Sequence, residues 1–204
     1  MKLKNIVYLP LFLSLASCLP VGNEQKSTDG AYEVSLSGSD LNYVPTTDDQ
    51  RDDPAYMGSI NTLIEQLASD RYDDDVFITF IKAIAWTESK WEHYFEVDGK
   101  YYVFRGDEGH SFGIMQIYDT YHGEHPILQD NLEYGIDFAY EKYLNAQSDD
   151  CDSGSNKGST IVPTLRRAYA QYNGGNGAIC RDDDPRDNNL EDAYSQQPWL
   201  DYLP

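Results

Sequence analysis

One glutamate, Glu88, combines an acidic group with surroundings typical of a protein core. The segment 75–89 predicts a helix on which Phe77, Ile81 and Ile84 share one stripe, and the same stripe meets Glu88 four residues later. A carboxylate on a core-facing stripe costs free energy when it is ionised, so its pKa should be raised. A carboxyl group that is still protonated near neutral pH can act as the general acid that cleaves a glycosidic bond.

Two later segments complete a pattern that begins with Glu88-Ser89. Residues 111–117 read Ser-Phe-Gly-Ile-Met-Gln-Ile, and residues 168–175 read Ala-Tyr-Ala-Gln-Tyr-Asn-Gly-Gly. In this order the three blocks resemble the family of soluble lytic transglycosylases, which is related to goose-type lysozyme. That family pairs a Glu-Ser with a Gly-Leu-Met-Gln-like block and an Ala-Tyr-Asn-like block. The resemblance spans about residues 57–203.

The resemblance implies a lysozyme-like fold and a role for Glu88 as both acid and base in cleaving peptidoglycan. The bond would be the β-1,4 link between N-acetylmuramic acid and N-acetylglucosamine, and the product would be a 1,6-anhydro sugar. Substrate-binding residues expected beside Glu88 are Ser89, Met115, Gln116, Tyr118, Tyr172 and Asn173.

Five of these residues have a specific expected role. Ser89 either orients the carboxyl group or bonds the backbone at the helix end, and Met115 is expected to pack beneath the cleft. The amide of Gln116 suits sugar hydroxyl or acetamido groups. The hydroxyl of Tyr172 should position the sugar or the Glu88 carboxyl, whereas Asn173 is expected to support a helix end.

The sequence is also compatible with two other functions. A hydrolytic lysozyme on the same fold would need a second carboxylate, since most glycosidases use two. Asp98, Asp107, Glu108 and Asp119 are candidates for it, although none lies in a recognisable motif. A lipoprotein that binds peptidoglycan without cleaving it is the third possibility.

The N-terminus resembles a bacterial lipoprotein signal. A short basic segment precedes the apolar run 6–16, which is too short to span a membrane, and Leu-Ala-Ser-Cys follows at 15–18. We therefore expect a signal peptide at 1–17, a lipidated Cys18, and a flexible tether from 18 to 55, because that stretch is polar with no helical period. A domain at 56–204 would follow, on the periplasmic side of the envelope, with the outer membrane as the expected anchor.

The other two cysteines, Cys151 and Cys180, form an even pair once Cys18 is lipidated. In an exported protein the environment is oxidising, so we expect them to form one disulfide.

The charge and the histidines restrict the partners. A net charge of -20 argues against nucleic acid or an anionic membrane surface as the partner. The same charge suggests an acidic groove that would favour deacetylated peptidoglycan. The four histidines show no metal-binding spacing, so we expect no metal. We also expect no cofactor and a monomer.

Hydrophobic periodicity and turn residues predict a mainly α protein of the α+β class. The Asp-Gly at 98–99 lies between two aromatic runs and predicts a β-hairpin over 94–104, directly after the helix that carries Glu88. The other expected helices are 58–69, a short one from about 112 that carries Gln116, 131–147, 160–173 and 190–196.

Overall fold

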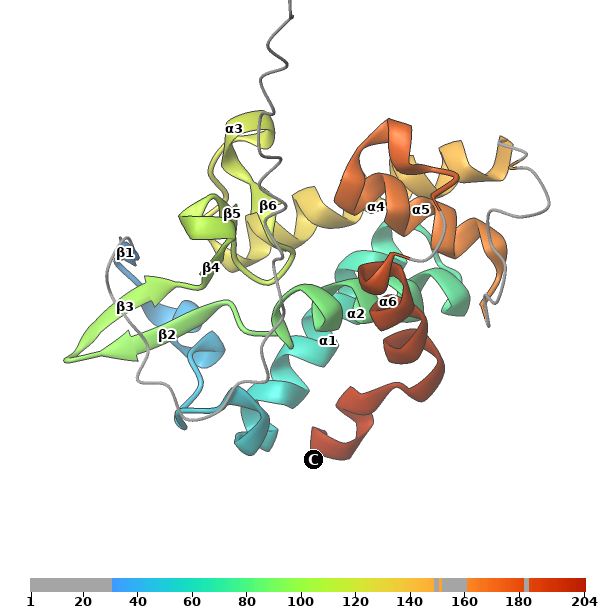
Figure 1. The fold of residues 1–204 in the computed structure, drawn as a ribbon. Coiled ribbons are helices and arrows are strands. Elements are labelled where there is room, and N and C mark those ends of the chain that lie inside the picture. The colour runs from blue at the N-terminus through green and yellow to red at the C-terminus, as the bar shows by residue number, and fades with distance from the viewer. Residues whose placement is uncertain (1–30, 149–150, 152–160, 182–183) are drawn as a thin grey trace, which may run out of the picture.

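Helix α2 (Asp75–Ser89) packs against α1 (Pro54–Arg71) on one side and α6 (Pro185–Gln196) on the other. The computed structural model describes residues 31–148, 151, 161–181 and 184–204. Two further helices, α4 (Leu128–Ser148) and α5 (Pro163–Gly174), pack on each other. Figure 1 shows the helices together, with the small strands gathered at one side of them.

The strands form two small antiparallel sheets, so the described chain is mainly helical with minor β-structure, as the sequence predicts. One sheet has the order β1-β3-β2 and the other the order β4-β5-β6. The strands are β1 (Tyr32–Val34), β2 (Tyr94–Val97), β3 (Lys100–Val103), β4 (Arg105–Gly106), β5 (Ser111–Phe112) and β6 (Ile117–Tyr118). The short helix α3 (Asp119–His122) follows β6.

The ends of the main helices follow from capping residues. The Asp53 side chain accepts a hydrogen bond from the amide of Tyr56, and Pro54 occupies the first turn, so α1 begins four residues earlier than the periodicity predicts. Asp74 caps α2 through the amide of Phe77. Asp184 likewise accepts from the amide of Arg186, which starts α6 well before the expected residue 190. Both helices start with a capping aspartate followed by a proline, a local signal that hydrophobic periodicity does not contain.

The hairpin after α2 is confirmed: β2 and β3 pair in register from Tyr94 opposite Val103 to Val97 opposite Lys100. Asp98 and Gly99 form its turn, both with positive φ, at 52° and 75°. This geometry matches the left-handed turn that an Asp-Gly dipeptide favours.

The expected tether contains ordered structure that belongs to the domain. Strand β1 pairs with β3, with Tyr32 opposite Val103, and the Tyr32 ring meets the Phe112 ring edge-on at 5.3 Å between centroids. Two short 3₁₀-helices follow, Gly38–Tyr43 and Gln50–Asp52. The scattered apolar residues of this stretch pack on the core without needing a helical period. The boundary expected at residue 56 is therefore wrong within residues 31–55; residues 18–30 and Cys18 lie outside the described residues.

The expected short helix at 112 is also wrong. Residues 111–118 form β5, a tight turn and β6, and the turn needs left-handed backbone at Gly113 (φ 63°) and Gln116 (φ 47°). A continuous helix excludes such angles.

The core forms around α2, from which Phe77, Ile81 and Ile84 are fully buried. The disulfide between Cys151 and Cys180 is present, as predicted. Within the described part of the chain, no helix combines the length and apolar character needed to cross a bilayer.

Candidate active site

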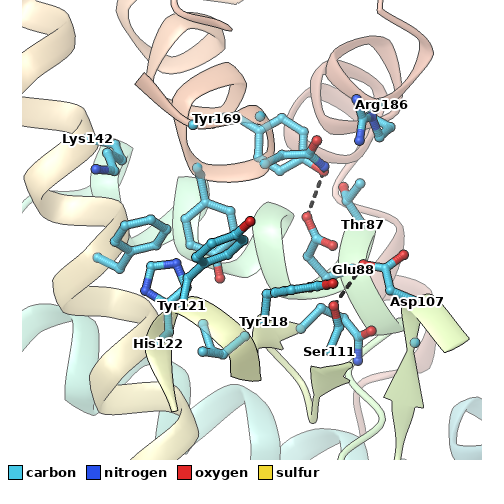
Figure 2. Close-up of a pocket in the computed structure, with 18 of the residues that line it drawn as sticks. Thr87, Glu88, Asp107, Ser111, Tyr118, Tyr121, His122, Lys142, Tyr169 and Arg186 are labelled. Carbon is cyan, nitrogen blue, oxygen red and sulfur yellow. Dashed lines mark hydrogen bonds between the residues drawn. The ribbon is translucent and has the colours of Figure 1, made fainter. Parts of the chain in front are cut away.

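A cleft of about 920 Å³ lies between the helices and the second small sheet, at the upper end of the range for small-molecule sites. Figure 2 shows its lining: Asp107 and Arg186 lie to one side of Glu88, and Tyr121 lies to the other. The helical wall comes from the end of α2 and from α4, α5 and α6; the other wall comes from the β4–β6 sheet and α3.

Glu88 lies in the last turn of α2, where the buried stripe of the helix reaches the cleft. Its side chain is partly buried and opens only to the cleft. The residue that follows the helix, Lys90, has a left-handed conformation that ends the helix directly after the acid. The helix therefore delivers a carboxyl group from the core to the cleft wall.

The carboxyl group of Glu88 is held by two side chains of α5. The Tyr169 hydroxyl donates to Oε1 of Glu88 at 2.8 Å, and Asn173 also hydrogen-bonds this carboxyl group. The Asn173 amide donates in turn to the Tyr169 oxygen at 3.3 Å. These contacts form a small network that fixes one carboxyl oxygen.

Burial raises the pKa of Glu88 from its usual 4.5 to about 7. The hydrogen bond from Tyr169 works in the opposite direction, and the negative charge of Asp107 raises the pKa further. Asn173 and Arg186 lower it to a smaller extent. The result is a carboxyl group that is substantially protonated near neutral pH, which is the state a general acid needs.

Tyr169 was not singled out from the sequence, although it stands in the Ala-Tyr-Ala-Gln-Tyr-Asn block. It lies four residues before Asn173 on α5, so the two side chains share a helix face. This spacing was the one sequence signal that could have placed Tyr169 beside Asn173 in the site. The Tyr-Asn pair of the resemblance drew attention to Tyr172 instead.

Tyr172 lines the cleft, but its hydroxyl is engaged elsewhere. It donates to the carbonyl of Met115 at 2.7 Å, so the expectation that it positions the Glu88 carboxyl is wrong. Asn173 was expected to support a helix end, yet its side chain faces Glu88 and Tyr169 in the cleft. The helix end is formed by Gly175.

Ser89 and Met115 lie beneath the cleft rather than in its lining. The buried Ser89 hydroxyl hydrogen-bonds the carbonyls of Ala85 at 3.0 Å and Ile114 at 2.9 Å, which is the backbone-bonding alternative. Met115 is fully buried and packs against Gly135 of α4, where an added Cβ would lie 2.6 Å from the Met115 side chain. Neither is placed to contact a substrate.

Side chains of His93, just before β2, and of Asn131 on α4 hold the 112–116 turn. His93 accepts a hydrogen bond from the Ile114 amide at 3.1 Å, and Asn131 accepts from the Met115 amide at 3.0 Å. Asn131 also donates to the carbonyl of Phe112 at 2.9 Å. Burial lowers the pKa of His93 to about 3, so the ring stays neutral and can accept this bond. The turn is therefore fixed without a regular hydrogen-bond ladder.

This turn presents Gln116 to the cleft. The Gln116 side-chain amide donates to the carbonyl of Gly113 at 2.7 Å, and its Oε1 lies against Gly106, which has no room for a Cβ. Gln116 thus has a fixed side chain as well as a strained, left-handed backbone, a combination that is common at functional sites.

Asp107 is the second carboxylate of the cleft. It accepts a hydrogen bond from the Ser111 hydroxyl at 2.8 Å, and its charge acts on Glu88. Figure 2 shows Asp107 and Ser111 beside Glu88. Asp107 and Glu108 are consecutive non-glycine residues with positive φ, 46° and 56°. Of the other candidates, Asp98 is in the hairpin turn, and Asp119 contacts Arg105 and His110.

Two tyrosines form an aromatic surface at the cleft. Tyr118 and Tyr121 stack at 5.5 Å between centroids with planes at 26°, and Tyr121 is 81% exposed. An exposed ring of this kind can stack on the apolar face of a sugar. Tyr118 is therefore in the cleft lining, and Tyr121 extends the same surface.

Two buried polar atoms in the cleft lack a protein partner among the described residues: Oγ1 of Thr87 and Oδ1 of Asn173. Unpaired buried polar atoms are rare and costly, so the protein leaves two polar groups unsatisfied at this wall of the cleft.

The acidic groove expected from the net charge is not what the cleft presents. Lys142 and Arg186 both line it, and the two carboxyl groups in the lining are Asp107 and Glu88, whose pKa is raised to about 7. The negative charge of the chain therefore lies mainly outside the cleft. In the described part of the chain, no group of three or more His, Cys, Asp or Glu side chains is arranged to hold a metal ion.

Comparison of the chain with protein-family models, curated proteins and solved structures finds no match. The resemblance to lytic transglycosylases therefore stays a prediction from the three sequence blocks.

Proposed function

We propose that this protein is a peptidoglycan lytic transglycosylase in which Glu88 is both acid and base. The observation that carries the proposal is the state of Glu88 in the cleft: a carboxyl group with a pKa raised to about 7 and one oxygen held by Tyr169. Thr87, Gln116 and Asn173 around it offer hydroxyl and amide groups suited to a glycan.

In the first step Glu88 protonates the glycosidic oxygen between N-acetylmuramic acid and N-acetylglucosamine. Because Oε1 accepts the Tyr169 hydrogen bond, the acid proton resides on the other oxygen, Oε2. The bond from C1 of the muramic acid to the leaving oxygen breaks with its electron pair moving to that oxygen. The acetamido oxygen of the same sugar can stabilise C1 as the bond breaks.

In the second step the Glu88 carboxylate accepts the proton of the C6 hydroxyl, while that oxygen bonds to C1. Glu88 thereby regains the proton that it donated, no water is consumed, and the product is a 1,6-anhydro sugar. A pKa near the working pH suits a group that must give and take a proton in one cycle.

A second function, hydrolysis as in a lysozyme, is favoured by one specific observation. Asp107 lies in the same cleft and interacts electrostatically with Glu88. A carboxylate so placed could activate water for attack at C1, as in two-carboxylate glycosidases. In that case Asp107→Asn would abolish cleavage; in the transglycosylase it would leave cleavage in place and lower the Glu88 pKa.

A third candidate is a protein that binds peptidoglycan without cleaving it. In each case we propose attachment to the outer membrane through a lipidated Cys18 and action as a monomer on glycan strands.

The test is digestion of purified peptidoglycan by the wild-type domain and by Glu88→Gln. We expect soluble muropeptides from the wild type and none from the variant, with strand binding retained by both. Cleavage by Glu88→Gln at the wild-type rate would remove the assignment of the acid, and binding without cleavage by the wild type would favour the third candidate.

A further inference from the structure

The ammonium group of Lys142 is an unusual feature of the cleft wall, because the side chain is only 7% exposed. Lysine is rarely buried to this extent unless it is paired, since removing an ammonium ion from water costs free energy. Lys142 lies on α4, and Figure 2 shows it beyond Tyr121 and His122, away from Asp107 and Arg186.

The protein groups around this ammonium compensate its charge only weakly. Nζ donates to Oδ1 of Asn176 at 3.2 Å and lies 4.5 Å from the centre of the Phe138 ring, and both partners are neutral. The anionic partner is the neighbouring Glu141, at 3.0 Å, whose side chain is 61% exposed. An ion pair with a solvated carboxylate contributes little.

A buried cation elsewhere in the fold shows the contrast. Arg166 is 6% exposed and pairs with Glu191, which is itself 8% exposed, so both charges are buried together between α5 and α6. Among the residues that the structure describes, Lys142 has no such buried counter-ion; its charge is directed at the cleft instead.

The rest of this end of the cleft is uncharged. Tyr121, Phe138 and Tyr172 supply aromatic surface, and burial lowers the pKa of His122, which keeps its ring neutral at pH 7. The low polarity of these walls strengthens the attraction of the ammonium for an anion.

We propose that Lys142 forms a carboxylate-binding subsite and that the cleft thereby selects glycan strands with an anionic substituent. This inference rests on the proposed function, because it places a glycan in the cleft. In a murein strand the carboxylate has two sources: the lactyl group of a muramic acid without its peptide, or a carboxylate of the attached stem peptide. Unsubstituted N-acetylglucosamine polymers have neither.

The experiment measures binding in the Glu88→Gln background, so that it does not depend on turnover. Five probes are compared: chitohexaose, peptide-free murein oligosaccharides, peptide-bearing ones, and the amidated form of each of these two murein probes. We expect the carboxylate-bearing probes to bind about tenfold more tightly than their amidated counterparts, the effect of one charge-assisted hydrogen bond. The peptide-free and peptide-bearing arms identify which carboxylate is bound.

Lys142→Met should remove this preference and leave chitohexaose binding unchanged, whereas Lys142→Arg should keep most of it. The matched control is Lys82→Met: Lys82 is 11% exposed and pairs with the half-exposed Glu65, yet it does not line the cleft. It should retain the full preference.

Equal affinity of the protein that retains Lys142 for the free and amidated forms of both murein probes would overturn the proposal. So would a preference that survives in Lys142→Met. Failure of the proposed function is a separate result, namely no cleavage of any strand by the wild type. In either case, the ratio of affinities for free and amidated probes decides whether Lys142 binds a carboxylate.

Discussion

Tyr169 and Glu88 come from different helices, and the tyrosine hydroxyl donates a hydrogen bond to the glutamate at 2.8 Å. Since Tyr169 stands on α5 and Glu88 on α2, the geometry of the acid depends on how these helices pack. The bond also acts on protonation: it lowers the pKa of Glu88 against the larger effect of burial.

Tyr169→Phe should therefore shift the pH dependence of cleavage. Without the donor, the pKa of Glu88 rises further above about 7, so the alkaline limb of the rate profile moves to higher pH. The rate at the optimum should fall roughly tenfold because the carboxyl group loses its fixed orientation. Tyr172→Phe is the control, since that hydroxyl bonds the Met115 carbonyl; its alkaline limb should stay in place. An unmoved limb in Tyr169→Phe would contradict the assigned role.

Glu88→Gln should make the protein more stable at alkaline pH. The folded state raises the pKa of Glu88 from 4.5 to about 7, so the unfolded chain loses this proton first as pH rises. Glu88 therefore costs no stability below pH 4.5, a growing amount between the two values, and on the order of 3 kcal/mol above pH 7. The difference in unfolding free energy between wild type and variant, measured by urea denaturation at pH 4 and pH 8, isolates this group. An equal difference at both pH values would show that the glutamate is not destabilised by burial.

Gly113→Ala should destabilise the fold through the turn that presents Gln116. Gly113 has φ 63°, and an added Cβ would lie 2.3 Å from the His93 ring. Gly99→Ala in the hairpin turn is the matched control, because φ is 75° but the space around it is open. Both variants carry the backbone strain, and only the first adds a clash, which costs about 1–3 kcal/mol more. Equal losses in urea denaturation would mean that the turn moves freely to accept the methyl group.

Removal of the disulfide should lower stability by about 3–4 kcal/mol, the loop-closure entropy for cysteines 29 residues apart. The comparison is thermal unfolding of the wild type with and without a reducing agent. The double variant Cys151→Ser with Cys180→Ser serves as a control that the reducing agent should not affect. Identical melting of oxidised and reduced wild type would contradict the expectation.

The sequence was sufficient where one local signal decides the structure. The stripe of Phe77, Ile81 and Ile84 predicts α2, and Asp98-Gly99 predicts the hairpin; both are confirmed. The disulfide followed from counting cysteines.

The sequence was insufficient where tertiary contacts decide. The segment 112–116 has helical residues but is held as a turn by His93, Asn131 and Ser89, which are distant in sequence. Strand β1 forms only because β3 offers it an edge. The exchange of roles between Tyr169 and Tyr172 has the same cause, since the rotation of α5 about its own axis decides which hydroxyl reaches Glu88.

The most direct test of the central claim is the mass of the products released from purified peptidoglycan by the domain that lacks residues 1–18. If Glu88 acts alone as acid and base, the muropeptides will be one water lighter than hydrolysis products and will carry no reducing end. Products of full mass with a reducing end would contradict the transglycosylase mechanism and assign Asp107 the activation of water.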